Sequence, residues 1–141
     1  MRNFFQKKNK FSDGLFREIE AACEGLVYMS ETDSEVRSFA GTRVSNLTRD
    51  VIIQQTGMAA ETPVEEANFG TFFTRLTAAQ PWHGEAEKAR AEKFLVLQKL
   101  LEENLRDRKV FRIGRIRLDI YAVGIDKDGT LIGIKTNAVE T

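Results

Sequence analysis

The segment that most constrains the fold is residues 118–125, which has the length of a β-strand and is apolar on both faces. Alternate positions give two apolar sets: Leu118, Ile120 and Ala122; Tyr121, Val123 and Ile125. Such a strand belongs in the middle of a sheet that is covered on both sides. Strands predicted over 110–113 and 130–134 flank it, joined by connectors at 114–115 and 126–129 that suit tight hairpins. The segment therefore predicts an α/β fold of the α+β type: an α/β/α sandwich with a central, mainly antiparallel sheet.

Two amphipathic segments supply helices that could cover this sheet. The longest and clearest runs from Glu85 to about Arg106, with apolar residues on one face and charged residues on the other. The other follows a cap at Ser12 or Asp13 and carries an apolar stripe that includes Cys23. Gly25 fits the left-handed residue that commonly follows a helix end.

The region between these helices contains shorter elements. An apolar run at 26–29 leads into a polar, acidic loop at 30–34, and a strand is predicted over 35–40. A short helix is predicted from a cap at Ser45 or Asn46 through residue 55, with Gly57 as its stop.

Residues 62–69 have two interpretations. Thr62-Pro63-Val64-Glu65 has the form of a helix start, with a capping Thr, Pro in the first position and Glu three residues after the Thr. Gly70 interrupts the helix that would follow. The alternative is an extended segment over 64–69, with a helix beginning near Gly70.

Composition limits the kinds of site that the chain can hold. The 141 residues fit one domain, divided into a flexible basic tail over 1–11 and a single domain over 12–141. One cysteine and one histidine exclude a disulfide framework within the chain and any site that needs two histidines. No apolar run approaches the roughly 20 residues of a membrane span, and no secretory signal is evident. We therefore expect a cytoplasmic protein without a membrane partner.

The formal net charge of zero is the sum of unlike segments. Residues 11–35 carry a net charge of −6 and residues 61–87 a net charge of −4, whereas residues 106–117 carry +5. A chain without net positive charge does not favour direct binding to bulk nucleic acid. We interpret the arginines of 106–117 as decorating the outside of a hairpin.

Few side chains stand out as chemical groups. Cys23 and His83 could form a nucleophilic pair, but Cys23 lies on the apolar helix stripe and is better interpreted as core. Trp82, in a loop at 79–84, fits equally a lid on the core and an anchor for a binding partner. From the residue pattern alone, Glu31 is interpreted as a solvent-exposed charge, and residues 138–141 are interpreted as a fraying end.

Several stretches, in order and with similar spacing, resemble the nuclease A inhibitor family over residues 12–141. They are Gly25–Glu31, Gln55–Gly57, Thr62–Glu65, Trp82–Glu85, Leu118–Gly124 and Val139–Thr141. The resemblance implies an α/β/α sandwich and a protein that is not an enzyme. It implies an inhibitor, monomeric when free, that binds a secreted, sugar-nonspecific ββα-metal nuclease one to one and blocks its active site.

The resemblance also implies three contact residues: Glu31, Trp82 and the terminal Thr141. In that family the terminal Thr reaches the divalent metal of the nuclease, so Thr141 is expected to contact a metal that the partner holds, and the free protein is expected to need no cofactor. The acidic segments would steer it toward a basic cleft. The alternative is a non-enzymatic protein-binding module of the same fold with an unrelated target.

Overall fold

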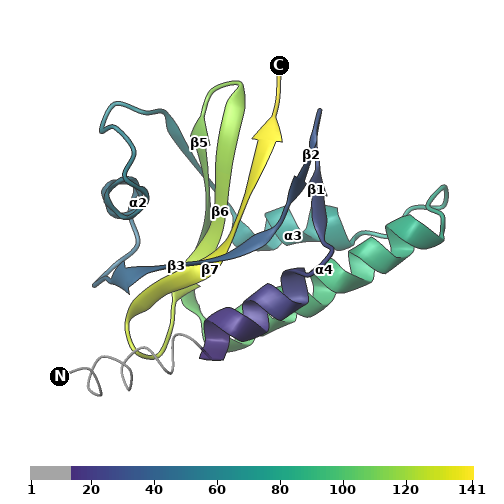
Figure 1. Ribbon diagram of the computed structural model, residues 1–141, viewed down its shortest axis with the longest axis horizontal. Coiled ribbons are helices and arrows are strands. Elements are labelled where there is room, and N and C mark those ends of the chain that lie inside the picture. The colour runs from purple at the N-terminus through teal and green to yellow at the C-terminus, as the bar shows by residue number, and fades with distance from the viewer. Residues whose placement is uncertain (1–13) are drawn as a thin grey trace.

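The computed structural model describes residues 14–141, and its centre is a five-stranded sheet in the order β3-β7-β6-β5-β4. Every neighbouring pair in this sheet is antiparallel. Figure 1 shows the long strands β5, β6 and β7 side by side. The strands are β3 (Arg37–Arg43), β4 (Val64–Ala67), β5 (Arg106–Gly114), β6 (Arg117–Ile125) and β7 (Thr130–Val139).

The central strand β6 has a hydrophobic cluster on each face, as its sequence predicts. Leu118, Ile120 and Ala122 belong to the larger cluster, while Tyr121 and Val123 belong to the smaller one on the opposite face. The sheet is therefore covered on both sides, which confirms the predicted α+β class and the α/β/α layering.

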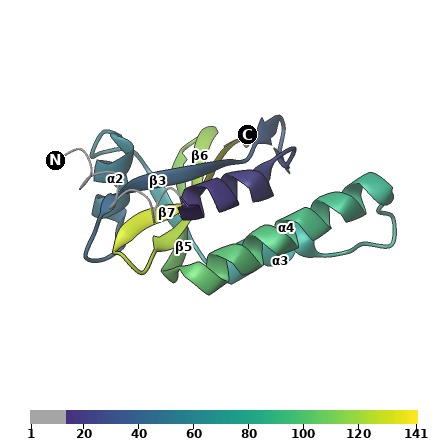
Figure 2. The same ribbon diagram turned by 60° about the horizontal axis from the view of Figure 1, so that its bottom comes forward.

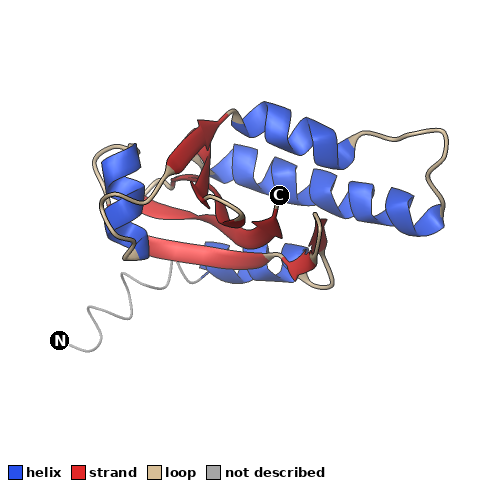
Figure 3. Cartoon of the chain, turned by 90° about the horizontal axis from the view of Figure 1, so that it is seen from above, coloured by secondary structure: helices blue, strands red, loops and turns tan. Residues whose placement is uncertain are grey.

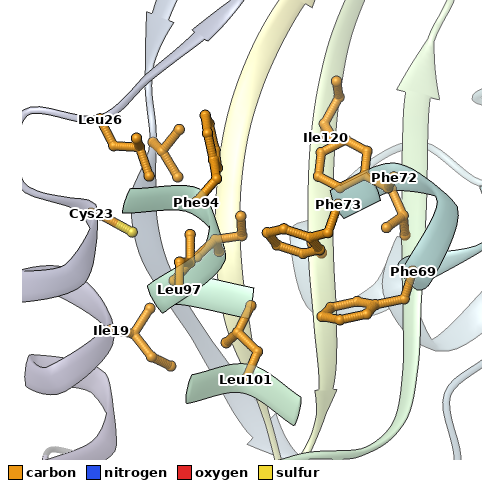
Figure 4. Close-up of a cluster of buried hydrophobic side chains, with 14 of the residues drawn as sticks. Ile19, Cys23, Leu26, Phe69, Phe72, Phe73, Phe94, Leu97, Leu101 and Ile120 are labelled. Carbon is orange, nitrogen blue, oxygen red and sulfur yellow. The ribbon is translucent and has the colours of Figure 1, made fainter. Parts of the chain in front are cut away.

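Three helices cover the face with the larger cluster: a helix described over residues 14–23, α3 (Phe69–Thr77) and α4 (Glu85–Asn104). Figure 2 shows the first of these crossing the same face as α4. In Figure 4 Ile19 and Cys23 point toward Leu97 and Leu101 of α4, with Phe73 of α3 further along the cluster. Gly25 follows the first helix with φ of 73°, which confirms its predicted left-handed conformation.

The short helix α2 (Arg49–Thr56) covers the other face and buries Ile52. Its cap is Thr48, whose side chain accepts a hydrogen bond from the Val51 amide, so the prediction of Ser45 or Asn46 as the cap was wrong. Each of these residues can cap a helix, and local pattern alone did not identify Thr48. Gly57 ends the helix in the left-handed conformation, as predicted.

The structure resolves the two interpretations of residues 62–69 in favour of the extended one. Strand β4 pairs with β5, with Val64 opposite Ile113 and Ala67 opposite Val110. The helix starts after Asn68, whose side chain accepts from the Thr71 amide. The Thr62-Pro63 pattern therefore does not begin a helix, because pairing with a strand that comes much later in the chain outweighs this local signal.

A small two-stranded hairpin, formed by β1 (Val27–Met29) and β2 (Asp33–Glu35), is a separate sheet that lies beside β7 of the main sheet (Figure 1). The acidic loop predicted over 30–34 is thus shorter than expected, and the following strand begins at Arg37 rather than Glu35. β7 also continues to Val139, where composition alone suggests a fraying end. None of the helices described over 14–141 is long and apolar enough to span a membrane. The basic tail predicted over 1–11 and the helix cap predicted at Ser12 or Asp13 lie outside the described residues.

Candidate functional site

A tight turn at residues 30–32 joins β1 to β2 and presents the exposed side chain of Glu31. The Ser30 amide and the Ser30 hydroxyl both donate to the Thr32 carbonyl, at 3.1 Å and 2.9 Å. Serine side chains close turns by this kind of local hydrogen bond. The turn therefore holds Glu31 at the end of the hairpin.

The end of β7 lies against this turn. The Val139 amide donates to Ser30 Oγ at 3.1 Å, and the Glu31 amide donates to the Val139 carbonyl at 3.3 Å. Two residues beyond, the Thr141 hydroxyl donates to Glu31 Oε1 at 2.6 Å. Figure 1 shows the end marked C close to the β1–β2 hairpin. The structure thus brings together two predicted site residues that are 110 positions apart in the sequence.

Arg112 of β5 reaches the same place, which sequence reasoning did not anticipate. Its guanidinium donates to Glu140 Oε1, and its Nε lies 3.6 Å from Glu65 Oε1. Burial acts to lower the pKa of Arg112, but the hydrogen bond and charge of Glu140 outweigh it, so the net pKa lies above its ordinary value. We call Glu31, Glu140 and Thr141 together the acidic tip. Only the alignment of β5, β6 and β7 shows that Arg112 belongs beside it.

Trp82 lies in the loop between α3 and α4, which projects beyond the sheet in Figure 3. Its side chain is 77% exposed, and its ring meets the edge of the His83 ring with centroids 5.9 Å apart. The Gln80 amide donates to His83 Nδ1 at 3.2 Å, and this hydrogen bond within the loop restricts its conformation. This exposure excludes the interpretation of Trp82 as a lid on the core. Trp82 and the acidic tip are thus carried by separate elements.

Cys23 is a core residue, as predicted, and is not placed for nucleophilic chemistry. Burial, with a smaller contribution from the charge of Glu20, raises its pKa to about 12. His83 lies in the α3–α4 loop, where its Nδ1 already accepts from Gln80. The structure therefore gives no support to a Cys23–His83 pair.

The basic segment 106–117 lies on β5 and the start of β6, where several of its charges have partners within the protein. Lys109 Nζ lies 3.5 Å from Glu66 Oε1 and donates to the Leu47 carbonyl, while Arg112 pairs with Glu65. Cross-strand pairing of β4 with β5 thus joins part of the acidic segment 61–87 to the basic segment. The interpretation that the arginines decorate the outside of the hairpin therefore fails for Arg112, which is only 20% exposed, while Arg106, Arg115 and Arg117 are exposed. Ion pairs also partly neutralise Glu65 and Glu66 of the acidic segment.

Over residues 14–141, no cluster of three or more His, Cys, Asp or Glu side chains has an arrangement that could hold a metal ion. The acidic tip instead presents oxygen atoms from exposed residues at the edge of the molecule. Such groups can meet a cation or a basic side chain that another molecule supplies.

Comparison with known proteins adds one finding. A search of curated proteins returned no match. The model of a family described as nuclease A inhibitor-like protein matches residues 13–141, a range that includes Glu31, Trp82 and Thr141. Because the match covers nearly the whole chain, the chain belongs to the nuclease A inhibitor-like protein family.

Proposed function

We propose that this protein is an inhibitor that binds a sugar-nonspecific ββα-metal nuclease one to one, covers its active site and has no catalytic activity of its own. Membership of an inhibitor-like family supports the general function. The proposal that the protein covers the active site of the nuclease rests on the hydrogen bond from Thr141 to Glu31, because this bond gathers two candidate contact residues at one exposed tip. In this proposal the protein acts in the cytoplasm and is a monomer until it meets the nuclease.

The acidic tip suits a cleft that normally holds a phosphodiester. Divalent cations such as Mg²⁺ take oxygen ligands and often keep positions open for substrate. Thr141 offers a hydroxyl and the main-chain carboxylate to the metal of the nuclease. Glu31 can pair with a cationic side chain that otherwise holds phosphate, an interaction of about 1.5–3 kcal/mol. Trp82 supplies a large apolar anchor at a second point of contact.

The test is cleavage of plasmid DNA by a panel of ββα-metal nucleases in Mg²⁺, with the full chain in excess. Three variants separate the groups of Thr141: deletion of the residue, Thr141→Val, and a Gly-Ser extension after Thr141. The Val variant keeps the carboxylate and loses the hydroxyl, whereas the extension keeps the hydroxyl and converts the carboxylate to an amide. We expect the deletion and the extension to weaken inhibition most.

Each result has a distinct meaning. Full cleavage by every nuclease of the panel in the presence of the unaltered protein would refute the inhibitor proposal. Tight inhibition by the deletion variant would refute the contact between Thr141 and the metal while leaving inhibition itself established. We expect Glu31→Gln to weaken binding roughly 10- to 100-fold, as loss of a charge-assisted hydrogen bond requires.

A further inference from the structure

We propose that Arg112 is a positioning residue: its ion pair with Glu140 holds residues 139–141 in the arrangement that places Thr141 beside Glu31. This inference rests on the proposed function where it concerns nuclease binding. Its structural part, the fixing of the chain end, can be tested on the free protein.

The surroundings of Arg112 hold its side chain in place. It rises from β5, is only 20% exposed, and has Glu65 of β4 on one side and Glu140 on the other. Arg112 also lines a pocket of about 390 Å³, together with Tyr28 of β1 and Phe72 of α3. Rings of Tyr28 and Phe72 stack with centroids 5.8 Å apart. Arg112 therefore lies at the base of the acidic tip, between packed elements.

Contacts on two sides hold residues 139–141. On one side, Val139 and Thr141 bond to the β1–β2 turn through Ser30 and Glu31. On the other, the Glu140 amide donates to the Ile116 carbonyl at 2.9 Å, and the Glu140 carboxylate accepts from Arg112. Chain ends fray unless such contacts tie them down. Among these contacts the Arg112–Glu140 pair is the one that joins two opposite charges.

Charge makes this pair important. The acidic tip places the Glu31 side chain beside Thr141, and Glu140 directly precedes Thr141 in the chain, so two negative side chains share this end of the molecule and repel one another. Arg112 sets a positive charge against Glu140 and so reduces this repulsion at the base of the tip. An end that is already ordered has less freedom to lose when a partner binds. We therefore expect loss of Arg112 to speed dissociation of the nuclease complex more than it slows association.

The variant is Arg112→Met, which keeps a long apolar stem and removes the charge. Its matched control is Arg115→Met, which makes the same change of net charge at an exposed position of the β5–β6 turn. Glu140→Gln tests the other member of the pair and keeps Arg112 in place should Arg112→Met fail to fold. Backbone ¹⁵N relaxation of the free protein reports the order of residues 140 and 141, and stopped-flow kinetics with an inhibited nuclease reports association and dissociation.

We expect residues 140 and 141 to become mobile in Arg112→Met and Glu140→Gln, and to stay ordered in Arg115→Met. Dissociation should quicken about tenfold in Arg112→Met and less in Glu140→Gln, because Glu140→Gln also removes one of the repelling charges. Association should change less than twofold, and the double variant should lose no more than Arg112→Met alone. An ordered chain end in both variants would overturn the proposal, as would faster dissociation with the end still ordered. Failure of the unaltered protein to inhibit would refute the proposed function instead, because the relaxation measurement needs no nuclease.

Discussion

Replacing Trp82 by alanine should leave the fold intact and weaken the nuclease complex about a hundredfold. A tryptophan side chain has roughly 200 Å² to bury, and with 77% of Trp82 exposed about 150 Å² remain for a partner to cover. At about 25 cal/mol per Å², full burial contributes about 4 kcal/mol. Alanine keeps part of that surface, so the expected loss is about 3 kcal/mol, or roughly a hundredfold in Kd.

Two measurements check this prediction. Calorimetric titration of an inhibited nuclease gives Kd, and urea unfolding of the free protein gives the free energy of unfolding, which should change by less than about 0.5 kcal/mol. Val96→Ala on α4 is the control. Val96 is also exposed, at 61%, but it lies beside the helix of residues 14–23, where the proposal places no contact with the nuclease. Unchanged affinity in Trp82→Ala, or a loss of stability above about 2 kcal/mol, would refute the reasoning.

Three further predictions concern the fold. Leu97→Ala should lower the free energy of unfolding by about 3 kcal/mol in urea titrations, because Leu97 is fully buried, while Leu95→Ala on the exposed side of α4 should cost under about 1 kcal/mol; equal effects would contradict the assigned helix face. Gly133→Ala should lower the melting temperature measured by circular dichroism, since its Cβ would lie 2.1 Å from the Ala122 backbone oxygen; an unchanged value would contradict the β6–β7 register. Cys23, with a pKa of about 12, should resist a thiol reagent at pH 8 until urea unfolds the chain, and prompt reaction in the native protein would show that it is accessible.

The central layer could be predicted from the sequence because its signal is local. Residues 118–125 carry both apolar faces in one segment, and α4 repeats its apolar face over several turns. The state of residues 64–67 could not be decided in the same way, because it depends on pairing with β5. Ser45 and Asn46 are intrinsically somewhat better helix caps than Thr48, so local chemistry pointed away from the residue that caps α2.

The candidate site was predictable only in pieces. Glu31 and Thr141 follow from the family resemblance, but their hydrogen bond depends on where β7 ends relative to the β1–β2 turn. Arg112 carries no sequence signal of its role, because its partners Glu65 and Glu140 lie in distant parts of the chain. For Trp82 the sequence left two interpretations, and its exposure removes one of them.

The position of β7 between β3 and β6 has a consequence for biosynthesis. β3 is made early, yet its sheet partner is β7, with Arg37 opposite Lys135 and Arg43 opposite Thr130. A growing chain on the ribosome must therefore keep β3 unpaired until β7 emerges, and closing so long a loop makes this edge slow to form. The acidic tip depends on the same strand, so a nascent chain that lacks β7 has neither a complete sheet nor the tip. Chaperone binding to stalled chains should therefore fall once β7 has left the ribosome.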